Sequence, residues 1–98
     1  MKTVYIAGAI SDDPDYKAKF DKAEKHLQSL GFVCMNPAVL PNNSEFTYDN
    51  YIRIGRAMLR ACSTICLLPD YETSNGALFE KCVALIYGKE ILYYEDLT

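Results

Sequence analysis

Glu80 is the residue whose type and surroundings most suggest chemistry. It and Lys81 are the only charged side chains in residues 76–87, a segment that is otherwise apolar or small and reads as a buried helix. Burial without a cationic partner raises the pKa of a carboxyl group, and such groups are candidate catalysts. The alternative is that Glu80 faces solvent and is stabilised by the positive end of the helix dipole. On a helix, the positions beside it are small enough to leave an open slot above the carboxylate: Gly76, Ala77, Val83 and Ala84.

Other residues suited to binding follow the apolar segments that we expect to be strands. In parallel sheets, ligands bind beyond the carboxyl ends of the strands, where the strand order switches. The hydroxyls of Ser11 and Ser74, and the amides of Asn75 and Gly76 at a helix start, can hold a phosphate or a sugar hydroxyl. The residues expected at this edge follow three successive strands: Gly8 and Ser11, then Asn36, then Asp70, Ser74, Asn75 and Gly76.

The elements that must position these residues alternate between strand and helix. Short apolar runs predict strands at 3–7, 32–35, 64–68 and 90–94. The first helix is expected to start at Asp13 and Pro14, which suit an N-cap and a first helical residue, and to end at Gly31. Two further helices are expected, one from 46 or 47 to 61 and one at 76–87. Strands joined by helices imply parallel pairing. We therefore expect an α/β fold, a flavodoxin-like or Rossmann-like three-layer sandwich with a four- to five-stranded parallel sheet.

Composition narrows the class of protein. The 98 residues suit a single domain, 1–98, and the net charge of −3 with scattered basic residues argues against binding a nucleic acid polymer. No apolar run approaches the length that spans a membrane, so we expect a cytoplasmic protein without membrane contact. His26 is expected to be a solvated helix residue, and no pair of cysteines has metal-ligand spacing. We therefore expect reduced core cysteines, no metal and no cofactor.

Three segments carry a resemblance to a known family. They are YIAGAIS at 5–11, NP at 36–37, and LLPDYETSNGALFEKCVALIYGKEI at 67–91. The most specific part is the spacing S-x-G-A-x-x-E from Ser74 to Glu80, which follows an apolar strand. Over nearly its whole length the chain resembles the nucleoside 2-deoxyribosyltransferase-like superfamily, especially its short bacterial and phage branch.

The resemblance implies an activity and roles for particular residues. Glu80 matches the glutamate that attacks the anomeric carbon of a nucleoside, and Tyr5 and Gly8 match residues that line the sugar and base pocket. Ser74 matches a serine that contacts phosphate in relatives acting on nucleoside monophosphates, so the resemblance leans toward a phosphorylated substrate. The implied function is an N-glycosidase or deoxyribosyltransferase acting on a nucleoside or nucleotide, the small-molecule partner. Relatives are oligomers, and the eight tyrosines also favour a homo-oligomer with the pocket near the interface.

Departures from the family pattern keep alternatives open. Gly55 and Ser63 stand where active relatives carry aspartates. Ala9 and Ser11 stand where monophosphate hydrolases of the family carry serine and arginine, which bind phosphate more strongly. Another acidic residue must then protonate the leaving base in place of the missing helix aspartate. Asp70 is the candidate catalytic residue, and Glu72 and Asp49 are further options. A module of the same fold that binds nucleotides without cleaving them is the alternative function. A signalling receiver is disfavoured, because residues 7–9 lack the acidic pair that it needs.

Overall fold

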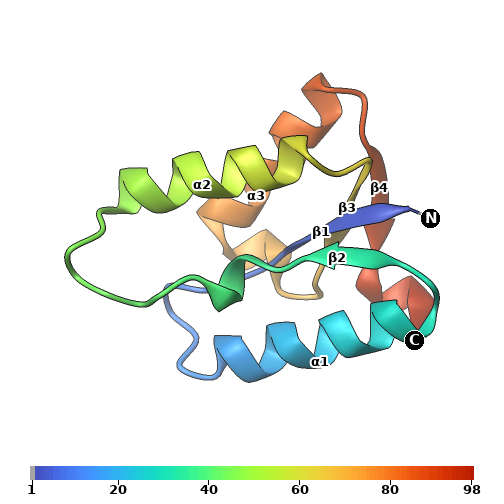
Figure 1. Ribbon diagram of the computed structural model, residues 1–98, viewed down its shortest axis with the longest axis horizontal. Helices are drawn as coiled ribbons and strands as arrows, with labels where there is room; N and C mark the ends of the chain where they lie inside the picture. Colours follow the sequence, from blue (N-terminus) through green and yellow to red (C-terminus); the bar gives the residue numbers. More distant parts are fainter. Residues whose placement is uncertain (1) are drawn as a thin grey trace.

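Residues 2–98, described here by a computed structural model, form a three-layer α/β sandwich (Figure 1). The four strands are β1 (Thr3–Ala7), β2 (Val33–Met35), β3 (Thr64–Leu67) and β4 (Glu90–Tyr93). All pair in parallel in the order β2-β1-β3-β4. From β1 the chain crosses to β2 on one side of it and then to β3 on its other side, so the strand order switches between β1 and β3. The predicted α/β fold class and parallel sheet are confirmed.

Side chains of the central strands alternate between two cores. Val4 and Ile6 of β1 pack with Phe20 and Leu27 of helix α1 (Tyr16–Ser29) on one face. Tyr5 and Ala7 point to the other face, which is covered by helices α2 (Tyr48–Arg60) and α3 (Asn75–Ile86). This period of two follows from strand geometry. It places Tyr5 on the same side of the sheet as α2 and α3.

Three short 3-10 turns complete the chain: Pro37–Val39, Tyr71–Thr73 and Tyr94–Leu97. The first lies between β2 and α2, and the second lies in the loop between β3 and α3. Among residues 2–98, no helix is long and apolar enough to cross a membrane.

The structure corrects several local predictions. Helix α1 begins at Tyr16, not at Asp13 and Pro14, because Asp13 closes a turn by accepting a hydrogen bond from the Asp15 amide at 2.9 Å. His26 is not simply solvated, since its Nε2 lies 2.7 Å from the carbonyl oxygen of Leu97. Cys82 is exposed, although a core position was expected. The third helix is not fully buried either, because it forms an outer layer and exposes Leu78, Phe79, Leu85 and Ile86.

Candidate active site

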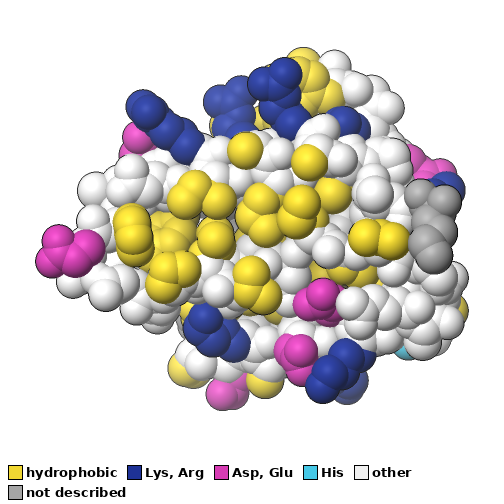
Figure 2. Space-filling model, in the orientation of Figure 1, with side chains coloured by type: hydrophobic (Ala, Val, Ile, Leu, Met, Phe, Trp, Pro, Cys, Tyr) yellow, Lys and Arg dark blue, Asp and Glu magenta, His cyan; other side chains and the backbone are white. Residues whose placement is uncertain are grey.

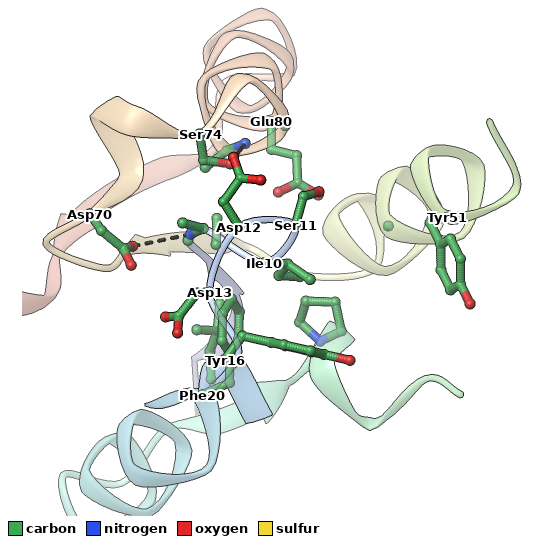
Figure 3. A pocket seen from close by; sticks show the side chains of 18 of the residues that line it. Ile10, Ser11, Asp12, Asp13, Tyr16, Phe20, Tyr51, Asp70, Ser74 and Glu80 are labelled. Atoms are coloured by element: carbon green, nitrogen blue, oxygen red, sulfur yellow. Dashed lines mark hydrogen bonds between the residues drawn. The ribbon is translucent and has the colours of Figure 1, made fainter. Parts of the chain in front are cut away.

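A cleft of about 1070 Å³ opens at the carboxyl ends of β1 and β3, where the strand order switches (Figure 3). Its walls are the loop after β1, the segment after β2, the first half of α2, and the loop leading into α3. Ligands of open parallel sheets bind at this place. The cleft therefore lies where the polar residues after the strands were expected to converge.

Glu80 lies on the α3 side of this cleft. Ser74 starts α3 by accepting a hydrogen bond from the Ala77 amide at 3.1 Å, and Glu80 follows on the second turn. Its Oε2 accepts a hydrogen bond from the Tyr5 hydroxyl. Burial raises the pKa of Glu80 to about 7, although the bond from Tyr5 opposes the rise. Near neutral pH both the acid and the carboxylate are therefore populated.

Tyr5 is the partner of Glu80 and lies in the middle of β1. Its side chain is only 1% exposed, and burial followed by the charge of Glu80 holds its pKa well above the ordinary value. Tyr5 therefore keeps its proton and acts as a donor. The hydroxyl holds the carboxylate through Oε2, so Oε1 is left for other contacts.

Gly55 lies against this pair from α2. A Cβ added at this position would come within 3.0 Å of Glu80 Oε2 and 3.1 Å of the Tyr5 hydroxyl. Both distances are closer than ordinary carbon contacts, so a larger side chain would have to displace the pair. The glycine in the helix interior is explained by this close approach, despite its cost of about 1 kcal/mol in helix propensity.

Asp70 lies in the cleft lining but is held by other groups. Its Oδ1 accepts a hydrogen bond from the Ala9 amide at 3.1 Å, and its Oδ2 pairs with the ammonium of Lys19. Lys19 also contacts Asp13 at 2.7 Å and donates to the carbonyl of Ala9 at 2.7 Å. These contacts fix the loop after β1 to both α1 and the loop after β3. No sequence pattern marked Lys19, because its partners are up to 51 residues away.

The structure brings together most of the predicted site residues. One predicted binding residue, Asn36, does not line the cleft. Its Oδ1 accepts from the Ala38 amide at 2.8 Å and its Nδ2 donates to Glu24 at 3.0 Å, so it starts the turn after β2. The predicted residues that do line the cleft are Tyr5, Gly8, Ser11, Asp70, Ser74, Asn75, Gly76 and Glu80.

Several lining residues were not predicted. Tyr48 and Tyr51 were counted among the tyrosines that favour an interface, yet both line the cleft. The Tyr51 hydroxyl donates to the carbonyl of Pro41 at 2.5 Å, which ties α2 to the segment after β2. Asp12 also lines the cleft and is exposed. Across residues 2–98, no three His, Cys, Asp or Glu side chains gather in a way that could hold a metal ion.

Comparisons with known proteins agree with this architecture. The model of the family described as "Domain of unknown function (DUF4406)" matches residues 2–93. No curated protein matches the chain. A 2-desoxiribosyltransferase from Leishmania mexicana superposes with a TM-score of 0.73 at 26% identity, covering 95% of this chain and 63% of that one. The chain thus spans less than two thirds of that protein.

A second structure, the 2-deoxyribosyltransferase from the psychrotolerant bacterium Bacillus psychrosaccharolyticus, gives a TM-score of 0.72 at 18% identity. The match covers 93% of this chain and 70% of that one. The resemblance expected from residues 5–11, 36–37 and 67–91 is thereby confirmed at the level of the fold. The chain belongs to the DUF4406 family and has a nucleoside 2-deoxyribosyltransferase-like fold.

Proposed function

We propose that the protein cleaves the N-glycosidic bond of a nucleoside or nucleotide, with Glu80 as the nucleophile. The observation that carries this proposal is the Glu80 carboxylate, which lines the cleft, has a raised pKa and is held at Oε2 by the buried Tyr5 hydroxyl. The fold shared with two 2-deoxyribosyltransferases supports the same class of reaction.

The geometry suits a two-step reaction. Glu80 Oε1 attacks the anomeric carbon while the bond to the base breaks, and the carboxylate stabilises the oxocarbenium-like transition state. Water or an acceptor base then releases the sugar from Glu80 and regenerates the carboxylate. The ionised form must attack, so the rate should rise with pH through about 7, the pKa of Glu80.

Asp70 and the loop residues have supporting roles in this proposal. Asp70 pairs with Lys19, so we assign it to fixing the loop after β1 in place of the catalytic role first considered for it. Ser11, Ser74, Asn75 and Gly76 line the cleft, so we assign them to contacts with the sugar. Tyr5 and Gly8 shape the floor of the cleft at the end of β1.

A second candidate function is a binding module that retains the cleft without turnover. The observation that favours it is Gly55, which leaves α2 with no acidic group beside Glu80 to protonate a departing base. In that case the protein would bind nucleosides in the same cleft, and replacing Glu80 would alter affinity only.

We further propose that the protein self-associates through the apolar surface beside the cleft. Figure 2 shows apolar side chains gathered across this face between α1 and α2. Val33 and Met35 of the edge strand β2 are exposed, as are Val39 and Tyr48. Large exposed apolar patches mark interaction sites, and this one is continuous with the cleft lining at Tyr48.

Release of free base distinguishes the two functions. A panel of ribonucleosides, deoxynucleosides and their 5′-monophosphates should be incubated with the protein, and free base measured by chromatography. We expect Glu80→Gln and Glu80→Ala to lower release by several orders of magnitude while circular dichroism shows an intact fold. Glu95→Gln is the matched control, because Glu95 is exposed and outside the cleft lining. Release that survives in both Glu80 variants would refute the nucleophile assignment.

A further inference from the structure

The charged side chains that line the cleft are all acidic. They are Asp12, Asp13, Asp70 and Glu80, and no lysine or arginine is among the lining residues. The ammonium nearest to them in the described contacts is Lys19, which is already bound to Asp13 and Asp70. The cleft therefore carries an excess of negative charge, which opposes the dianionic phosphate of a nucleotide.

The cleft also lacks an evident acid for the departing base. The Tyr5 hydroxyl is committed to Glu80, and Gly55 places no functional group beside them. The bonds from Lys19 lower the pKa of Asp13, so this group remains ionised near neutral pH. A neutral nucleoside releases its base as an anion, and an anion leaving into an acidic cleft without a proton is disfavoured.

We propose, on the basis of the proposed N-glycosidic cleavage, that the preferred substrate is an unphosphorylated nucleoside whose base carries a positive charge. When Glu80 Oε1 forms its bond to the anomeric carbon, the electrons of the carbon–nitrogen bond pass to the ring nitrogen and neutralise the cation. The base leaves as a neutral molecule and needs no proton. Water then attacks the glycosyl ester, Glu80 leaves as carboxylate, and the proton of the water passes to solvent.

The aromatic side chains of the cleft favour the same class of ligand. Tyr48 and Tyr51 of α2 line it, and Figure 3 labels Tyr51 there. Tyr16 of α1 also lines it, but the ammonium of Lys17 already lies 5.4 Å from the centre of its ring. The face of an aromatic ring attracts a cation, and the attraction strengthens as water is excluded. Carboxylates and tyrosine rings together thus form a lining that suits a flat cationic base.

Two ligands of similar shape that differ in charge test the inference. Nicotinamide riboside carries a cationic ring, whereas its 1,4-dihydro form has a similar shape and no charge. Affinities should be measured by calorimetry on the Glu80→Gln variant, in which turnover is prevented. We expect the cation to bind on the order of tenfold more tightly at low salt, and the preference to shrink as salt is added. Equal affinities, or no binding of the cation, would overturn the inference.

Two further variants locate the source of the preference. In the Glu80→Gln background, Asp12→Asn should reduce the preference for the cation. Asp96→Asn is the control, since it removes the same charge from an exposed turn outside the cleft lining. A preference that Asp12→Asn leaves unchanged, or that Asp96→Asn reduces by as much, would contradict the role of the cleft charges.

Turnover by the wild-type protein separates this inference from the proposed function. Release of nicotinamide from the riboside should exceed the spontaneous rate by a larger factor than release of hypoxanthine from inosine. Glu80-dependent cleavage with equal binding of the cationic and the uncharged ligand would leave the function standing and refute the inference. A strong preference for the cation without any Glu80-dependent release would refute the function and retain the charge preference.

Discussion

Replacing Glu80 with glutamine should stabilise the folded protein at alkaline pH. Burial raises the pKa of Glu80 from 4.5 to about 7, so the folded state holds the proton more tightly than the unfolded state does. The free energy of unfolding of the wild type therefore falls as pH rises from about 4.5 through about 7. One pKa unit corresponds to 1.36 kcal/mol, so this rise lowers the free energy of unfolding by up to about 3 kcal/mol. Glutamine does not titrate and keeps the acceptor for the Tyr5 hydroxyl.

Urea denaturation from about pH 4 to pH 8 measures this difference. The free energy of unfolding of Glu80→Gln, relative to wild type, should increase by up to about 3 kcal/mol across that range and level off above pH 8. Glu72→Gln, a change on the exposed surface, should alter stability by no more than about 0.5 kcal/mol. A difference between Glu80→Gln and wild type that is independent of pH would refute the argument from burial.

Three other changes follow from the same geometry. Tyr5→Phe removes the hydrogen bond that lowers the pKa of Glu80, so the midpoint of the pH–rate profile should move above about 7; a downward shift would contradict this role. Gly55→Ala places a methyl group 3.0 Å from Glu80 Oε2, so base release should fall at least about tenfold while the fold persists. An unchanged rate would show that the close approach is unimportant. The protein should sediment as a dimer or larger assembly. Val39→Asp should weaken this assembly, whereas Ile86→Asp on α3 should not. A persistent monomer of 11.1 kDa would end the proposal of self-association.

Local signals were sufficient to predict most of the fold. The segment Thr3–Ala7 is a short β-branched run closed by Gly8, and it forms the strand predicted for it. The second helix was expected to start at 46 or 47, and Thr47 is its N-cap, whose side chain accepts a hydrogen bond from the Asn50 amide at 3.1 Å. The start of α1 was misplaced, because Asp13 bonds both to the Asp15 amide and to Lys19 in place of capping the helix.

The candidate site was less predictable because its contacts span the chain. Glu80 was recognised from its isolation among apolar residues, but its bond with Tyr5 joins positions 75 residues apart. The ion pair between Lys19 and Asp70 likewise joins positions 51 residues apart. Asn36 was misassigned because a side chain at the end of a strand can serve either a ligand or the next turn, and here it bonds to the Ala38 amide. Only tertiary packing decides between these uses.

Trapping the covalent intermediate tests the role of Glu80 most directly. The protein should be incubated with a nucleoside that it cleaves, quenched with acid, digested, and examined by mass spectrometry. We predict a glycosyl adduct on the peptide that contains Glu80, lost on treatment with mild base and absent from Glu80→Gln. An adduct on another residue, or base release by Glu80→Gln at the wild-type rate, would contradict the assignment of Glu80 as the nucleophile.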